Sequence, residues 1–151
     1  MNSTTHLKVY ADHGQFYLMD AHALPEYPEF VEDQHIEERF QTVPNLIAVY
    51  PTESHEVGVT INVLASEPCI DQEDWQHIAQ CSIDVPSGTL IIAGCADYLP
   101  DCPRVQVSRG PCGVIITGNQ LNQSPGESYH FFIWPSDEPK TKIIKRYGAT
   151  A

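Results

Sequence analysis

Long hydrophobic runs are missing from this 151-residue sequence. No stretch approaches the roughly 20 consecutive apolar residues that a membrane-spanning helix needs. The N-terminal segment, MNSTTHLKVYADHG, also lacks the cationic start and the apolar run of a secretory signal peptide. The sequence therefore predicts a cytoplasmic protein with no membrane span.

Basic residues are scarce. Eight Lys and Arg stand against 20 Asp and Glu, which gives a formal net charge of -12. Residues 1–75 hold 14 of the acids and 2 of the bases, whereas residues 76–151 hold 6 of each. A charge of this size favours solubility, repels nucleic acid and anionic membranes, and attracts basic proteins. It argues against direct nucleic-acid binding.

Sequence motifs of several enzyme classes are absent. The chain has no GxSxG, no HExxH, no glycine-rich phosphate loop and no CxxC pair. Its cysteines match no zinc-binding spacing, and their odd number argues against a complete disulfide framework. They are Cys69, Cys81, Cys95, Cys102 and Cys112. We expect core or turn thiols in a reducing compartment, with no cofactor and no catalytic residue.

Three residues near the N-terminus leave a metal-binding alternative open. His13, Asp20 and His22 would form a mixed histidine and carboxylate site for a divalent cation if the first two strands folded back on each other. The protein would then be a small metal-dependent hydrolase or a ligand-binding β-barrel. A polar turn with solvated histidines is the simpler interpretation of the same residues.

Short alternating segments, separated by Gly, Pro, Ser, Asn and Asp, make up most of the chain. In VGVTINVL, the alternate residues Val57, Val59, Ile61 and Val63 fall on one face, as expected of a half-buried strand. Similar segments are NLIAVYP, CSIDVP, TLIIAG, RVQVS, GVIITG, YHFFIWP and KIIKRY. We predict a single domain over residues 1–151, an all-β, mostly antiparallel β-sandwich of about eight to ten strands. Residues 148–151 are expected to be a frayed tail.

Two local structures are predicted near the N-terminus. Leu7 to Tyr10 and Gln15 to Met19 are expected to form a hairpin around an Asp-His-Gly turn. A short helix is expected from about Glu32 to Gln41, because Ile36 and Phe40 are four residues apart among charged residues.

Acidic residues alternate with large aromatic residues in two segments. Carboxylates steer a basic partner toward its site, and desolvated aromatic side chains supply most of the affinity. The expected partner-binding residues are Tyr27, Phe30, Glu32, Asp33, Glu37, Glu38, Asp71, Glu73, Asp74 and Trp75. Phe30 and Trp75 would serve equally well as core residues. The basic segment KTKIIKRY is expected to complement the acidic half of the chain or to form a lysine-protected edge strand.

The order of these segments resembles that of the ComJ (Nin) type of nuclease inhibitor. The likeness rests on His13, Gln15 and Phe16 in LKVYADHGQFYLMD, and on Asp84, Pro86 and Gly88 in SIDVPSG. The cysteine-containing segment GCADYLPDCPR departs from that pattern. The resemblance implies a noncatalytic acidic protein that masks a basic partner such as a nuclease. A structural β-sandwich interaction domain that oligomerises through strand edges is a further alternative.

Overall fold

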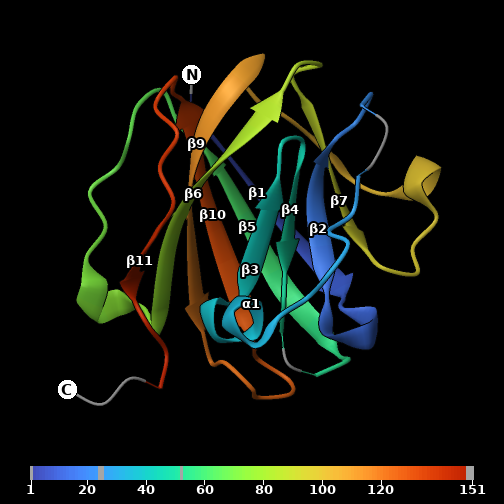
Figure 1. Cartoon of the computed structure of the whole chain (residues 1–151), viewed down its shortest axis with the longest axis vertical. Coiled ribbons are helices and arrows are strands. Elements are labelled where there is room, and N and C mark those ends of the chain that lie inside the picture. Colours follow the sequence, from blue (N-terminus) through green and yellow to red (C-terminus); the bar gives the residue numbers. More distant parts are fainter. Residues whose placement is uncertain (1, 24–25, 52, 149–151) are drawn as a thin grey trace.

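A computed structural model describes residues 2–23, 26–51 and 53–148, whose strands form a two-layered β-sandwich (Figure 1). The eleven strands are β1 (Ser3–Tyr10), β2 (Phe16–Asp20), β3 (Phe40–Val43), β4 (Leu46–Val49), β5 (Glu56–Val63), β6 (His77–Val85), β7 (Thr89–Gly94), β8 (Arg104–Gln106), β9 (Gly110–Asn119), β10 (Ser128–Pro135) and β11 (Lys142–Lys145). One α-helix, α1 (Asp33–Glu38), lies between β2 and β3. Short 3-10 helices cover Asp12–Gly14, Gln72–Asp74 and Leu99–Asp101. The predicted all-β class with a small helix is confirmed.

The strands are divided between two sheets. The six-stranded sheet has the order β1-β5-β10-β9-β6-β11, and the five-stranded sheet has the order β3-β4-β2-β7-β8. Among the strand pairs of the described residues, only β5 and β10 run parallel. The sandwich is therefore mostly antiparallel, as expected.

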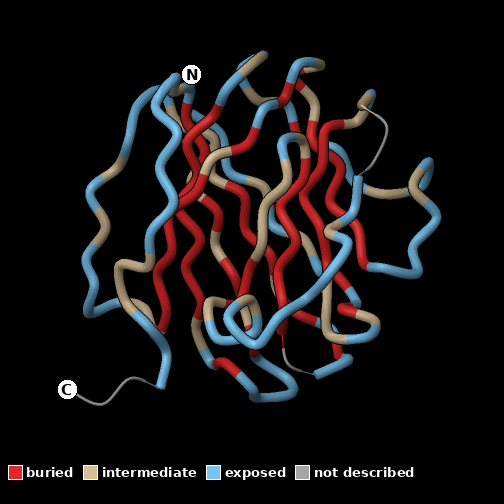
Figure 2. The backbone as a smooth tube through the Cα atoms, in the orientation of Figure 1, coloured by how far each residue is buried: buried red, intermediate tan, exposed pale blue. Residues whose placement is uncertain are grey.

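The main core lies between the two sheets, where the strands are most deeply buried (Figure 2). Val57, Val59 and Ile61 of β5 point into it, which confirms the alternation predicted for this strand. β2 differs, because all five of its residues are buried. Phe16 and Leu18 face the main core, while Tyr17 and Met19 belong to a second apolar cluster on the outer face of the five-stranded sheet.

The predicted N-terminal hairpin is wrong. β1 pairs with β5 in the six-stranded sheet, whereas β2 pairs with β4 and β7 in the other sheet. The connection crosses between the layers through Asp12–Gly14, with His13 at a φ of 58° and Gly14 at a φ of 69°. Side-chain alternation shows which face of a strand is buried, but it is the same whether the next segment pairs beside the strand or packs across the core.

The predicted helix is real but shorter than expected. α1 ends at Glu38, and Arg39 adopts a left-handed conformation with a φ of 66°. The next residue, Phe40, is buried and begins β3. The i, i+4 spacing of Ile36 and Phe40 therefore does not mark one helical face, because the chain changes direction between them.

A buried polar network explains that change of direction. The Arg39 guanidinium donates hydrogen bonds to the Tyr129 hydroxyl at 3.0 Å and to Asn122 Oδ1 at 2.8 Å, and it lies 3.8 Å from Glu127 Oε2. The Tyr129 hydroxyl donates to Glu127 Oε2 at 2.5 Å, and the Asn122 backbone N–H donates to Glu127 Oε1 at 2.8 Å. His55 Nε2 lies 3.2 Å from Glu127 Oε1. Arg39 is thus drawn into the end of the sandwich, which fixes where α1 stops.

Among the helices of the described residues, none is long and apolar enough to cross a membrane.

Removing the Glu127 carboxylate should destabilise the fold strongly. Glu127→Ala leaves the Arg39 charge buried without its counter-ion, and breaking a buried pair in this way costs about 3–5 kcal/mol of the free energy of unfolding. Urea denaturation measures the loss. Glu138→Ala is the matched control, because Glu138 pairs with Lys140 at an exposed site, where a loss of about 0–1 kcal/mol is expected. Equal losses in the two variants would contradict a structural role for the network.

Candidate protein-binding surface

The outer face of the five-stranded sheet carries a tyrosine-rich apolar cluster. Tyr17 and Tyr50 are buried in it, and the Tyr27 ring lies edge-on to Tyr17 with centroids 5.0 Å apart. Burial, and then the nearby Cys95, raises the pKa of the Tyr27 hydroxyl. Because these phenols stay neutral, the half-exposed Tyr27 ring packs on Tyr17 as an apolar group.

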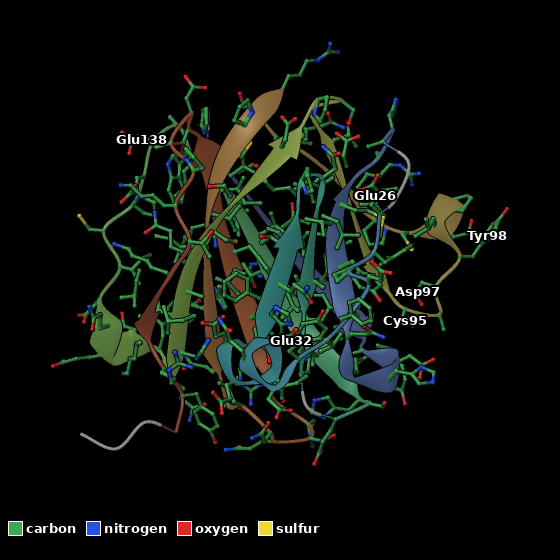
Figure 3. The ribbon with its side chains drawn as sticks, viewed as in Figure 1. Glu26, Glu32, Cys95, Asp97, Tyr98 and Glu138 are labelled. Carbon is green, nitrogen blue, oxygen red and sulfur yellow. The ribbon has the colours of Figure 1, made fainter. Side chains whose placement is uncertain are left out.

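Large apolar side chains beyond Tyr27 are left in solvent. Phe30 is 69% exposed, and Val31 and Ile36 are also exposed. Tyr98, from the loop after β7, is 71% exposed. Figure 3 shows Glu26 on the same side of the molecule as Cys95 and Tyr98, in agreement with the proximity of Tyr27 to Cys95. We call residues 26–38 together with Tyr98 the acidic–aromatic surface.

α1 supplies much of the charge on this surface. The helix begins after Glu32, whose backbone N–H donates to His35 Nδ1 at 3.0 Å. None of its six residues is buried. A helix this short is held by its ends, here by the contact at Glu32 and by the buried side chain of Arg39. Its carboxylates are therefore presented to solvent on a fixed support.

The second acidic segment lies on a different part of the molecule. Asp71 accepts a hydrogen bond from the Glu73 backbone N–H at 3.0 Å, which shapes the 3-10 helix Gln72–Asp74. Trp75 follows it and packs partly buried on the outer face of the six-stranded sheet. The Trp75 ring lies 4.8 Å from His130 and 6.3 Å from Phe132, measured between centroids. The structure therefore separates Trp75 from Tyr27 and Phe30, which lie on the other sheet.

The C-terminal strand lies between the two acidic segments. Lys145 Nζ donates to the Gln72 carbonyl at 2.8 Å, and the Arg146 guanidinium lies 4.0 Å from carboxylate oxygens of both Glu37 and Glu38. The expected intramolecular complement to the acidic half is therefore present at these contacts. β11 is also an edge strand with lysines at both ends.

The residues of the metal-binding alternative do not come together. His13 precedes β2 and is exposed, whereas Asp20 is buried at the opposite end of the same strand. Asp20 accepts hydrogen bonds from the backbone N–H groups of His22, Ala23 and Ser87, and from the Ser87 hydroxyl. Burial alone would raise the pKa of Asp20, but these hydrogen bonds hold it below its usual value. The carboxylate is used to fix a turn, and within the described residues no group of three His, Cys, Asp or Glu is placed to hold a metal ion.

The cysteines lie in the core and in loops, as expected, and all five are free. Burial raises the pKa of the Cys81 thiol well above its usual value, and raises that of Cys112 to about 11. Cys95 is exposed after β7, where its sulfur accepts from Gln15 Nε2 at 3.7 Å.

Sequence reasoning missed three contributors to the surface. Tyr98 lies in ADYLPD, where its acidic neighbours resemble those of Phe30 and were a usable signal. Val31 and Ile36 also lie among acidic residues, but aliphatic side chains of this size are more often buried, so nothing in the sequence signalled their exposure.

His77 joins α1 to the C-terminal segment. Its Nε2–H donates to the Glu38 carbonyl at 2.9 Å, and its Nδ1 accepts from the Tyr147 backbone N–H at 3.0 Å. Burial lowers the pKa of His77; the nearby Arg39 and Arg146 also lower it, and the contacts with Glu38 oppose the shift. The hydrogen bond from Tyr147 requires the neutral ring, because protonated Nδ1 has no lone pair to accept with.

The free energy of unfolding should therefore fall as the pH drops through about 6.5, the ordinary pKa of histidine. Below that pH the unfolded chain binds a proton at His77 before the folded protein does. Urea denaturation at about pH 7.5 and 5.5 measures the change. His77→Gln, which does not titrate, should show a smaller loss than the wild type, and an identical loss would assign the pH dependence to other groups.

Comparisons with known proteins find similarity at the level of structure. No protein-family model and no curated protein sequence matches the chain. The solved structure of ComJ from Bacillus subtilis, described as an inhibitor of the DNA-degrading activity of NucA, superimposes with a TM-score of 0.71 and 10% sequence identity, covering 90% of this chain and 99% of that one. A structure described as crocagin biosynthetic gene J superimposes with a TM-score of 0.65 and 13% identity, at the same coverage. The chain shares the ComJ fold, as its sequence resemblance implied.

Proposed function

We propose that this protein is a noncatalytic inhibitor that binds a basic protein, most specifically a nuclease, through the acidic–aromatic surface. The observation that carries the proposal is the exposure of Phe30 within the acidic segment of residues 26–38, with Tyr98 exposed on the same side of the molecule as Glu26 (Figure 3). The shared fold with ComJ, a protein described as a nuclease inhibitor, supports the same function. The five free cysteines are in keeping with a reducing compartment, and we place the protein in the cytoplasm.

Four of the six carboxylates on this surface have no ion pair among the described residues, whereas Glu37 and Glu38 lie beside Arg146. Among the ion pairs of the described residues, none involves Glu26, Glu29, Glu32 or Asp33. Uncompensated carboxylates beside exposed aromatic rings attract a cationic partner over several ångströms, and the rings then lose water at the contact. A basic partner gains from both effects.

The buried titratable groups support a structural role rather than catalysis. The Arg39, His55 and Glu127 side chains are between 0% and 8% exposed, so a substrate does not reach them in this conformation. Cys81 and Cys112 are buried, and their raised thiol pKa values disfavour the thiolate that a nucleophile needs. We therefore assign no catalytic residue.

An inhibition assay tests the function directly. The immobilised protein captures basic proteins from its native lysate at about 0.05 M salt, and about 0.5 M salt releases those held by charge. Each captured nuclease is then purified and its cleavage of a fluorogenic DNA substrate is followed as the protein is added. Loss of cleavage at a one-to-one ratio is expected. Full cleavage in the presence of excess protein, for every captured nuclease, would contradict the proposal.

Reversing charge on α1 should slow association with the captured partner. Asp33→Lys combined with Glu37→Lys replaces two exposed carboxylates one helical turn apart. We expect an association rate constant about tenfold lower at low salt, with a weaker dependence on salt concentration. Stopped-flow fluorescence measures both. Glu53→Lys with Glu67→Lys makes the same change in net charge at exposed sites outside the surface, and equal slowing in this control would remove α1 from the interface.

Truncating the exposed aromatic side chains should weaken binding without weakening the fold. Phe30→Ala and Tyr98→Ala remove large exposed groups, so the free energy of unfolding should change by less than about 0.5 kcal/mol. The dissociation constant should rise about tenfold or more for each. Isothermal titration calorimetry measures it, with Tyr10→Ala on β1 as an exposed aromatic control in the other sheet. An unchanged dissociation constant for both variants would show that these rings are not anchors.

A further inference from the structure

β11 is lightly held at the edge of the six-stranded sheet. Three residues of β11, Lys142, Ile143 and Lys145, pair with residues of β6. The register of this pairing shifts between Ile143 and Lys145. On its other side, β6 pairs with β9 without interruption from His77 to Val85. A strand with few ladder bonds and an interruption opens at a lower free energy than its neighbours.

The two isoleucines of β11 contact apolar clusters on opposite faces of the six-stranded sheet. Ile143 packs against the main core, and Ile144 packs on the outer cluster of the six-stranded sheet. The two adjacent isoleucines contact opposite faces of the sheet through the ordinary alternation of a strand. The edge of β6 therefore accepts a segment with two consecutive branched aliphatic residues.

The two cations that follow the isoleucines contact the two acidic segments of the chain. Lys145 reaches the Gln72 carbonyl in the acidic turn, and Arg146 lies between Glu37 and Glu38 at 4.0 Å from each. The next residue, Tyr147, is held by its N–H bond to His77 and by the Arg39 guanidinium, 5.2 Å above its ring. Residues 140–146 contain four of the eight Lys and Arg of the chain. The protein thus carries its own basic segment across the carboxylates of α1.

We propose that β11 occupies the place that a basic, extended segment of the partner takes in the complex. The partner segment pairs with the edge of β6 after β11 leaves it, and it carries two adjacent branched aliphatic residues followed by two cations. This inference rests on the proposed function, because it assumes that the partner is basic. It adds that recognition includes strand addition to β6 as well as contact with the acidic–aromatic surface.

Covalent attachment makes β11 a strong competitor for this edge. A short linker gives a tethered segment an effective concentration in the millimolar range. A free segment of similar sequence therefore displaces β11 only at comparable concentrations. A partner that also contacts Phe30 and Tyr98 gains affinity that β11 lacks, and so displaces it at lower concentrations. The tethered strand lowers the apparent affinity for partners that make only the strand contact.

Hydrogen–deuterium exchange tests the displacement. The probe is a synthetic peptide with the sequence of residues 139–148, PKTKIIKRYG, labelled with heavy isotopes so that its fragments are separate from those of the protein. With millimolar peptide, the amides of residues 142–145 of the full chain should exchange about tenfold faster or more. The amides of residues 78–80 in β6 should stay protected.

A peptide of the same composition in scrambled order is the matched control. It carries the same charge but lacks the adjacent isoleucines before the cations. Unchanged exchange in residues 142–145 at saturating PKTKIIKRYG would overturn the proposal. Equal displacement by the scrambled peptide would also overturn it, because charge alone would then suffice.

A pair of charge variants provides a second readout. Lys145→Gln with Arg146→Gln weakens the tethered competitor, and the labelled peptide should bind about three- to tenfold more tightly, because the Arg146 ion pairs and the Lys145 hydrogen bond to the Gln72 carbonyl are lost. Lys140→Gln with Arg109→Gln removes the same charge outside these contacts and should leave the affinity within about twofold. Equal tightening in both variants would contradict a specific role for β11.

Hydrogen–deuterium exchange in the complex with the captured partner distinguishes this inference from the proposed function. Accelerated exchange of residues 142–145 in the complex would support strand exchange. If the charge reversal on α1 slows association but β11 stays protected in the complex, the acidic surface is the binding site and the strand exchange is wrong.

Discussion

The structure depends on one buried carboxylate. Glu127 is closed off from solvent and accepts hydrogen bonds from the Tyr129 hydroxyl and the Asn122 backbone, with Arg39 and His55 as charged or chargeable neighbours. Those groups come from β10, the turn before it, the end of α1 and the segment before β5. Burying a charge is costly unless it is paired and hydrogen-bonded, so these elements are constrained to meet at one geometry. The position of α1 follows from that constraint.

Electrostatic roles are divided between the interior and the surface. Inside, Arg39 and Glu127 compensate each other at the end of the sandwich. Outside, the carboxylates of residues 26–33 are left without ion pairs among the described residues, while Arg146 compensates Glu37 and Glu38. Exposed pairs contribute little to folding, and uncompensated surface charge opposes it. The acidity of the first half therefore contributes little to stability and favours solubility, and under the proposed function it also favours association with a basic partner.

The sequence predicted the strands better than their partners. Alternation identified the buried face of β5 correctly, because that face depends only on the residues of the strand itself. The pairing of β1 with β5 joins residues 3 and 63, and no local pattern specifies such a contact. The same limit applies to the site. The acidic and aromatic composition of residues 26–38 is visible in the sequence, and their role in binding stays a prediction; the packing of Trp75 on His130 depends on a sheet whose strand order was unknown.

If the proposed inhibitor function holds, the basic strand β11 has a consequence for specificity. Long-range attraction draws many cationic proteins to the acidic surface, since Coulomb steering does not distinguish among them. Arg146 already occupies part of that surface, so a partner that offers charge alone gains less than the net charge suggests. Discrimination between cationic partners comes from the difference in their affinities. An intramolecular competitor lowers the apparent affinity of every partner, so that the weakly binding ones no longer bind appreciably. In the proposed complex, a partner with a matching strand and contacts to Phe30 and Tyr98 would overcome this competition, because those rings would contribute binding free energy that β11 does not supply.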